Sequence, residues 1–211
     1  MDEAFWHQKW QSGQIGFHRN DTNPFLLKYF SDLGLQQGQR VFLPLCGKTL
    51  DISWLLSQGY HVLGIELHEQ AVIELFEQLQ IIPNIMSLSE NLKRYSAERL
   101  DIYVGNFFSL TPDDLGNVDA VYDRAALVAL PESMRSDYCQ YLITLTNHAP
   151  ILLITYNYDQ TKVSGPPFSI SNEEVALHYQ QNFELKHLEQ TEVDGGHKGL
   201  CPAQENVWLI S

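Results

Sequence analysis

The chain has 211 residues, of which 44% are hydrophobic and 18% charged, and its formal net charge is -13. This length fits one well-buried domain, and the acidic balance argues against nucleic acid as the main partner, because binding phosphates requires clustered Lys and Arg. We see no apolar run of membrane-spanning length and no secretory signal pattern at the N-terminus. The cysteines Cys46, Cys139 and Cys201 lack metal-ligand spacing, so we expect reduced thiols in a cytoplasmic protein.

The predicted elements begin with a short helix at residues 2–10 and an amphipathic helix at 23–34. Asn23 is the expected cap of the second helix, Pro24 lies in its first turn, and Gly34 ends it. Apolar runs then alternate with segments of helical spacing. We expect strands at residues 40–45, 61–67, 100–108, 118–123, 150–158, 183–193 and 206–210. We expect further helices at residues 50–59, 68–80, 133–148 and 171–182.

This alternation predicts the α/β class, with a mostly parallel seven-stranded sheet that helices cover on both faces. The last two strands lack an intervening helix, so they should pair antiparallel at one edge. Ligands bind such sheets at the carboxyl ends of the strands, near the switch point. The chain places residues 45–47, Glu66, residues 105–107, residues 123–124 and Asn157 at those ends.

The loop after the first strand ends in Gly47, Lys48 and Thr49, which is the ending of a phosphate-binding loop. A Walker loop also needs a glycine five residues before Gly47, and Phe42 occupies that position inside the strand. A dinucleotide fingerprint needs three spaced glycines, so that the backbone can approach a pyrophosphate, and only Gly47 is present. Both phosphate-binding interpretations are therefore disfavoured.

Glu66 closes the apolar run of the second strand, about 20 residues after the loop, where a βαβ unit places a carboxylate beside a ribose diol. Such a carboxylate accepts hydrogen bonds from two vicinal hydroxyls. The site therefore suits an adenosine-like nucleoside without phosphates, and S-adenosylmethionine fits that description. The competing interpretation is a solvated strand end, which we disfavour because an acid at this place is what the motif requires.

Four segments resemble, in order, the thiopurine S-methyltransferase family, whose members are class I S-adenosylmethionine-dependent methyltransferases. These segments are residues 5–18, 40–67, 121–131 and 165–171. The bacterial members look most similar, and some of them are associated with methylation of selenium or tellurium species. The resemblance implies a Rossmann-like methyltransferase fold, one domain over residues 1–211, and residues 1–34 as a helical cover over the active site. It further implies a monomer that methylates the sulfur of thiopurines or other aromatic or heterocyclic thiols.

The family pattern also implies roles for single residues. The expected cofactor-binding residues are Trp10, Leu45, Gly47, Glu66, Asn106, Phe107 and Arg124. The expected substrate-binding residues are Phe17, His18 and Phe168. Trp6 and Phe17 match aromatic positions of the N-terminal cover. The segment 195–210 aligns only loosely with the family, and because it helps to shape the substrate mouth, the substrate preference is less defined than the reaction.

Arg124 is the candidate catalytic residue, because its charge and hydrogen bonds would favour the anionic form of a thiol acceptor. The alternative is that Arg124 pairs with Asp123 or another carboxylate and only braces the site. Asp123 itself reads as a structural partner rather than as a base. Trp6 and Trp10 share a helical face, so they either form a lid over a sulfonium or pack into the core.

Some residue types invite a functional interpretation that their setting does not support. Cys46 follows a buried strand and fits a packing thiol better than a nucleophile. His18 either reaches the substrate mouth or caps a turn, and Phe168 either lines a pocket or fills a structural turn. His197 and Cys201 provide only two candidate ligands, so we expect no metal site there.

Three other functions compete with S-methyl transfer. An NAD-linked oxidoreductase could use a similar sheet, but the glycines for a pyrophosphate are missing. A non-catalytic adenosine-binding module would bind the donor without transferring its methyl group. RNA methylation is disfavoured by the net acidity.

Overall fold

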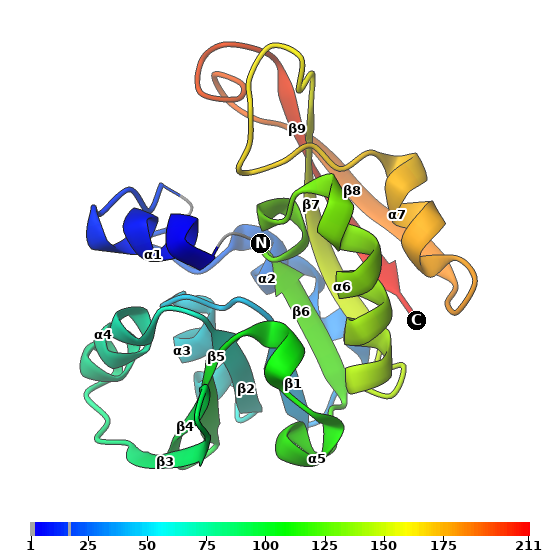
Figure 1. Ribbon diagram of the computed structural model, residues 1–211. Helices are drawn as coiled ribbons and strands as arrows, with labels where there is room; N and C mark the ends of the chain where they lie inside the picture. The colour runs from blue at the N-terminus through cyan, green and yellow to red at the C-terminus, as the bar shows by residue number, and fades with distance from the viewer. Residues whose placement is uncertain (1–2, 17) are drawn as a thin grey trace.

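The computed structural model describes residues 3–16 and 18–211. In this part of the chain nine strands form one sheet, in the order β3-β4-β5-β2-β1-β6-β7-β9-β8 (Figure 1). The strands are β1 (Arg40–Leu43), β2 (His61–Glu66), β3 (Asn84–Ser89), β4 (Leu92–Ala97), β5 (Leu100–Gly105), β6 (Ala120–Arg124), β7 (Ile151–Tyr158), β8 (Leu185–Glu192) and β9 (Ala203–Ile210). The helices are α1 (Glu3–Gln11), α2 (Pro24–Tyr29), α3 (Asp51–Ser57), α4 (Glu69–Leu79), α5 (Pro112–Leu115), α6 (Glu132–Leu145) and α7 (Asn172–Tyr179). The 3-10 helices are η1 (Phe30–Leu33), η2 (Phe107–Ser109) and η3 (Leu127–Ala129).

The five central strands, β5, β2, β1, β6 and β7, are parallel. The chain builds outward from β1 through β2 to β5 and then returns to β6 on the other side of β1. The switch point of the sheet therefore lies between β1 and β6, where a ligand site is expected at the carboxyl ends. The predicted antiparallel edge is confirmed, because β9 pairs antiparallel with both β7 and β8.

The prediction of seven strands is wrong, because β3 and β4 add an antiparallel hairpin at the other edge of the sheet. Five of the six β3 residues are exposed, so this edge strand carries no apolar run. In β4 the buried residues Leu92 and Tyr95 are three apart rather than two. A period-2 pattern is absent from both strands, and their pairing is set by the neighbouring β5 instead.

The two N-terminal helices are confirmed, and the second also in its cap and its end. Asn23 caps α2, with its side-chain oxygen accepting from the N–H of Phe25 at 2.8 Å, and Pro24 occupies the first turn. The element continues as η1 and ends at Gly34, whose φ of 67° suits glycine. The predicted strand 40–45 stops earlier, at Leu43, because the backbone turns at Leu45 with a φ of 48°.

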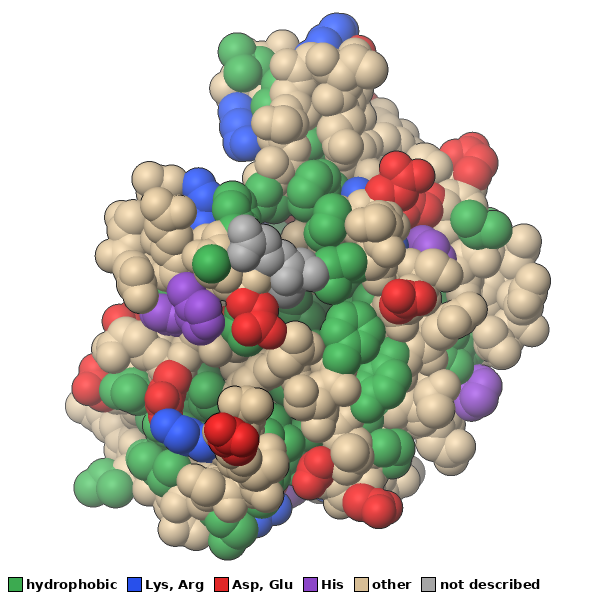
Figure 2. Space-filling model, viewed as in Figure 1, with side chains coloured by type: hydrophobic (Ala, Val, Ile, Leu, Met, Phe, Trp, Pro, Cys, Tyr) green, Lys and Arg blue, Asp and Glu red, His purple; other side chains and the backbone are tan. Residues whose placement is uncertain are grey.

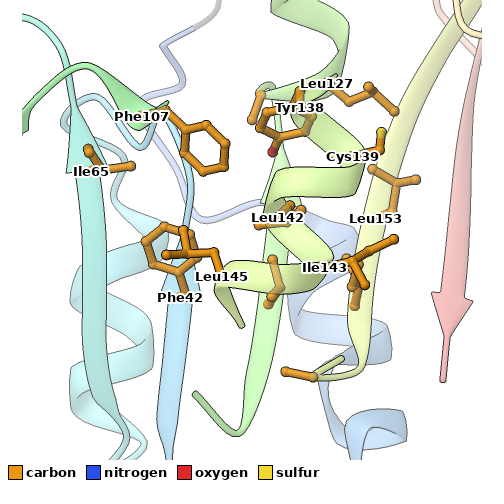
Figure 3. Packing of buried hydrophobic residues seen from close by; sticks show 14 of the residues in the cluster. Phe42, Ile65, Phe107, Leu127, Tyr138, Cys139, Leu142, Ile143, Leu145 and Leu153 are labelled. Atoms are coloured by element: carbon orange, nitrogen blue, oxygen red, sulfur yellow. The ribbon is translucent and has the colours of Figure 1, made fainter. Parts of the chain in front are cut away.

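Helices cover both faces of the sheet. On one face α6 packs against β1, β6 and β7, and the side chains labelled in Figure 3 fill the space between them. On the other face α2, α3 and α4 pack over Val41, Val62 and Ile102. Fully burying one such side chain contributes about 1.5–3 kcal/mol, so these two layers hold the central strands rigidly.

The carboxyl ends of the parallel strands share one end of the molecule with α1 and with the two loops that follow β7 and β8 (Figure 1). The described residues contain no helix with the length and hydropathy needed to cross a membrane. All three cysteines are buried free thiols within the described chain.

Candidate functional site

A cavity of about 730 Å³ lies at the carboxyl ends of β1, β2, β6 and β7. Its walls come from α1, the loop after β1, the strand ends, and the loops after β7 and β8. On the face seen in Figure 2, hydrophobic side chains run down the middle and charged side chains lie around them. Small-molecule sites are mostly apolar clefts of about 300–1,000 Å³, and this cavity falls within that range.

The loop after β1 forms one wall, and its backbone is strained. Leu45 has a φ of 48° and Gly47 a φ of 54°. A Cβ atom at Gly47 would lie 3.1 Å from the Trp10 ring, so the loop and α1 meet at this glycine. Left-handed conformations of non-glycine residues cost about 1–3 kcal/mol and concentrate at functional sites. The loop is therefore shaped for close approach to a ligand and to α1.

Glu66 ends β2 inside the same cavity and is only 6% exposed. Its Oε2 accepts from the Gly47 N–H at 2.9 Å, and its Oε1 accepts from the His68 N–H at 2.8 Å. Burial raises the pKa of the Glu66 carboxyl, and these backbone N–H groups oppose that shift. A carboxylate has about four acceptor positions, so each oxygen keeps one for a hydroxyl of a ligand.

Trp10 connects the cover helix to this wall. Its ring stacks on His68, with centroids 5.9 Å apart and planes 9° apart. The His68 Nδ1 lies 2.9 Å from the Nδ1 of His7, also in α1, and burial lowers the pKa of His68. Trp6 also lines the cavity. The structure thus places both tryptophans at the cavity wall rather than in a separate helix core.

Asn106 and Phe107 line a smaller cavity of about 30 Å³, which shares Leu45 and Leu67 with the large one. Asn106 donates from Nδ2 to the Oε1 of Glu3 at 2.7 Å, so the first described residue of α1 reaches this side as well. The two residues follow β5, which pairs with β2, the strand that ends in Glu66.

Arg124, at the end of β6, lines the large cavity, and Ala125 follows it with a φ of 69°. Asp123 points the other way. It is fully buried, its Oδ1 accepts from the Leu127 N–H at 3.2 Å, and its Oδ2 accepts from the Tyr138 hydroxyl at 2.7 Å. Burial raises the pKa of Asp123 to about 6. Asp123 is not among the described lining residues of the cavity, which agrees with a structural role.

The three candidate substrate-binding residues differ in where they lie relative to the cavity. His18 lines the cavity, and burial together with Lys48 and Arg124 lowers its pKa. Phe168 lies outside the described lining of the cavity. Its ring lies under the guanidinium of Arg135 at 5.6 Å, and the neighbouring Pro166 and Pro167 reach the wall instead. Phe17 lies outside the described residues.

Cys46 contributes to the wall as a packing residue. It is buried, and burial and the nearby Glu66 raise its pKa well above its ordinary value. A Cβ atom at Gly64 would lie 2.8 Å from the Cys46 sulfur, which shows how tightly the thiol fills the gap beneath the loop. A thiol that is neutral and tightly packed does not act as a nucleophile.

Sequence reasoning missed several residues that line the cavity. They are Asp51, Tyr122, Thr155, Tyr156, Lys198 and Glu205, together with His197, which it considered only as a metal ligand. Within the described ranges, no group of three His, Cys, Asp or Glu side chains could hold a metal ion. The strand-end position of Thr155 and Tyr156, just before Asn157, was the only available signal for this part of the wall.

A model of the thiopurine S-methyltransferase family matches residues 1–211. The thiopurine S-methyltransferase of Xanthobacter autotrophicus is 49% identical over 211 residues, which cover 100% of this chain and 99% of that protein. The protein of the same name from Acinetobacter baylyi is 46% identical over 215 residues, covering 100% and 99%.

Solved structures resemble the fold at lower identity. The 1,6-didemethyltoxoflavin-N1-methyltransferase of Burkholderia thailandensis, with bound 1,6-didemethyltoxoflavin and S-adenosylhomocysteine, has a TM-score of 0.66 at 14% identity, covering 99% of this chain and 87% of that one. TehB from Haemophilus influenzae has a TM-score of 0.61 at 12% identity, covering 97% and 65%. At these identities the likeness concerns the fold alone.

Proposed function

The chain belongs to the thiopurine S-methyltransferase family, and from that premise we propose that it transfers a methyl group from S-adenosylmethionine to the sulfur of a thiopurine or another aromatic or heterocyclic thiol. The observation that carries the proposal is the Glu66 carboxylate, which two backbone N–H groups hold at the cavity wall. The family favours this reaction over an NAD-linked oxidoreductase or an adenosine-binding module.

The residues present fit the methyl donor. Glu66 offers acceptor positions for the two ribose hydroxyls, and Leu45 and Gly47 let the backbone come close. Asn106 and Phe107 would flank the adenine, and the Trp10 face suits a sulfonium by a cation–π attraction of about 0.5–2 kcal/mol. When bound, S-adenosylmethionine supplies an electrophilic methyl group with a good leaving group. The cavity of about 730 Å³ has room for this donor and a small acceptor.

The contribution of the chain to the reaction is positioning, dehydration and charge. Holding a nucleophile at attack distance in a covered site removes most of the entropic barrier to a displacement. The segment that contains α1 acts as the cover, since Phe5, Trp6, Lys9 and Trp10 line the cavity, whereas α2, the later part of the expected cover 1–34, packs on a face of the sheet. The Arg124 guanidinium favours an acceptor in its anionic form, which is the stronger nucleophile.

The range of acceptors, the oligomeric state and the cellular location belong to the same proposal. Selenium and tellurium compounds are acceptors in addition to thiols, since their anions are equally suited to a covered wall that carries the Arg124 guanidinium. The monomeric state follows from the family resemblance, and the buried free cysteines support action on small molecules in the cytoplasm. Nucleic acid and membranes are not partners.

Transfer of labelled methyl to 6-mercaptopurine, thiophenol, selenite and glycine tests the proposal. We expect label on the sulfur and selenium acceptors and none on glycine. Arg124→Met should lower kcat/KM for thiophenol by about 10- to 100-fold, because a charge-assisted hydrogen bond contributes about 1.5–3 kcal/mol. Arg124→Lys, the matched control, should retain part of that activity. Tight donor binding without transfer to any acceptor would contradict the proposed reaction.

A further inference from the structure

The loop between β8 and β9 holds one side chain, His197, in a fixed place on the cavity wall. The His197 N–H donates to the Cys201 carbonyl at 2.7 Å, and the Gly196 N–H donates to the Val193 carbonyl at 2.8 Å. Gly196 has a φ of 68°, and a Cβ atom there would lie 2.2 Å from the Cys201 carbonyl oxygen. The backbone on both sides of His197 is therefore determined by the fold.

Two tyrosines of β7 fix the imidazole ring as well. The ring stacks on Tyr158, with centroids 4.2 Å apart and planes 28° apart, and it meets Tyr156 edge to face at 5.4 Å. The Tyr158 hydroxyl donates to the Pro167 carbonyl at 2.8 Å, which ties the stack to the loop after β7. Tyr156 and Pro167 line the cavity beside His197. Aromatic rings and a proline therefore hold the imidazole at this part of the wall.

The Nε2 atom of His197 is buried and has no hydrogen-bond partner among the described residues, and the whole residue is 3% exposed. The Thr155 hydroxyl, on the same wall, is likewise buried and without a partner in the described chain. An unsatisfied buried polar group costs about 1–3 kcal/mol, and most such groups in proteins are satisfied. Six other buried polar atoms of the described residues also lack a partner, but only His197 and Thr155 among these residues line the cavity, where a ligand could satisfy them.

The charges around the ring keep it neutral. Burial lowers the pKa of His197, and the adjacent Lys198 lowers it further. Burial raises the pKa values of Tyr156 and Tyr158, so these two neighbours add no charge near neutral pH. The remaining charged groups on this side are Glu205, which pairs with Tyr156 across β7 and β9, and Arg124 on the cavity wall. A neutral imidazole has one ring nitrogen that accepts a proton.

We propose that His197 binds the methyl acceptor through Nε2 and takes the proton that a protonated thiol loses as its sulfur becomes the nucleophile. This inference rests on the proposed S-methyl transfer and names the acceptor class, which is aromatic-bearing thiols that are still protonated at neutral pH. The S–H bond breaks, its electron pair stays on sulfur, and the proton forms an N–H bond at Nε2. Because Nε2 is buried, the ring then turns toward the cavity to release the proton to solvent. Thr155 holds the acceptor from the neighbouring strand end.

Two thiols of different acidity separate this role from a structural one. Benzyl mercaptan is largely protonated near pH 7, whereas pentafluorothiophenol is already ionised. His197→Phe keeps the stacked ring but removes the nitrogen. We expect it to lower kcat/KM for benzyl mercaptan by about 100-fold, the lower end of the usual contribution of a general base. For pentafluorothiophenol we expect a loss of less than about threefold, because no proton has to leave.

The control is His187→Phe. His187 also stacks on an aromatic ring, Trp208, at 4.3 Å, but its Nε2 lies 3.0 Å from the Asn206 Oδ1 and it is not a described lining residue of the cavity. We expect unchanged kinetics with both thiols. Affinity for S-adenosylhomocysteine, measured by calorimetry, should be the same in all three proteins. Equal losses with both thiols, or no loss with either, would overturn the proposal.

A readout other than turnover keeps this inference separate from the proposed function. In the complex with S-adenosylhomocysteine, the NMR signals of the His197 ring should shift on addition of benzyl mercaptan. The pH–rate profile of the wild type should have an acidic limb that is absent in His197→Phe. If no thiol is methylated but the ring signals shift, the proposed reaction fails and acceptor binding at His197 stands. If transfer occurs and the ring signals do not move, the inference fails alone.

Discussion

The two sides of the cavity are built in opposite ways. The proposed donor side, made of Leu45, Gly47 and Glu66 with Trp10 above them, has its key carboxylate already held by two backbone N–H groups. The proposed acceptor side, made of Thr155, Tyr156 and His197, carries two buried polar atoms without partners in the described chain. One side is satisfied before a ligand arrives, and the other is not.

This difference indicates which side of the cavity determines ligand selectivity. A satisfied carboxylate is preorganised, so binding the donor requires little rearrangement. Unsatisfied groups lower stability in the free protein, and a ligand that pairs with them regains that free energy. Such groups also reject analogues that leave them unpaired, which makes the acceptor side the more selective of the two.

The largest expected effect comes from breaking the donor side at Glu66. Glu66→Gln should weaken donor affinity by about 10- to 100-fold, since the loss of charge-assisted bonds is about 1–3 kcal/mol. Calorimetry with S-adenosylhomocysteine measures it, and Glu77→Gln, on the exposed face of α4, is the control. The amide side chain of the variant would place its NH2 group against one of the two backbone N–H groups. Two hydrogen-bond donors would then face each other, so the free energy of unfolding should fall as well. Unchanged donor affinity would contradict the ribose assignment.

Donor binding should also become weaker at low pH. Burial raises the Glu66 pKa in the free protein, so its ionised form is lost earlier on acidification than for an exposed glutamate. Affinity for S-adenosylhomocysteine should therefore fall as pH decreases through that pKa, and Glu66→Gln should flatten the profile. The same pH dependence in both proteins would show that another group controls binding.

A smaller effect is expected where the loop meets α1. Gly47→Ala combines a positive φ with a Cβ that would lie 3.1 Å from the Trp10 ring, so either the loop or the cover must move. We expect donor affinity to fall by about tenfold, or about 1.4 kcal/mol. Gly34→Ala has a similar φ of 67° with nothing within 4 Å of its Cβ, so it isolates the strain from the crowding. Equal donor affinity in both variants would show that Trp10 does not need this contact.

The smallest effect should come from the acceptor side at Thr155. Thr155→Val removes a hydroxyl that has no partner in the described ranges, so the free energy of unfolding should stay level or rise. Thr146→Val removes a hydroxyl of similar burial that donates to the Leu142 carbonyl at 2.8 Å, and it should lower that free energy by about 1 kcal/mol. Thr155→Val should raise KM for the thiol a few-fold. Equal destabilisation by both changes would show that the Thr155 hydroxyl is already satisfied.

The sequence by itself determined the α/β alternation, the antiparallel edge at β9 and the position of Leu45, Gly47 and Glu66 on the cavity wall. These features depend on local patterns, namely apolar strands, the cap at Asn23, one loop glycine, and an acid about 20 residues later. The hairpin of β3 and β4 escaped prediction, because an exposed edge strand has no apolar pattern of its own.

The tertiary structure alone brought together the residues of the proposed acceptor side. Thr155 and His197 are 42 positions apart and come together only because β9 pairs with β7 and the preceding loop turns back over the strand ends. The tertiary structure also placed the side chains of Asp123 and Arg124 on opposite faces of the sheet, since successive side chains of a strand alternate between the two faces. A donor site that one βαβ unit supplies can be recognised from its spacing. An acceptor site made by long-range pairing has no spacing to recognise, because its residues are neighbours in space and not along the chain.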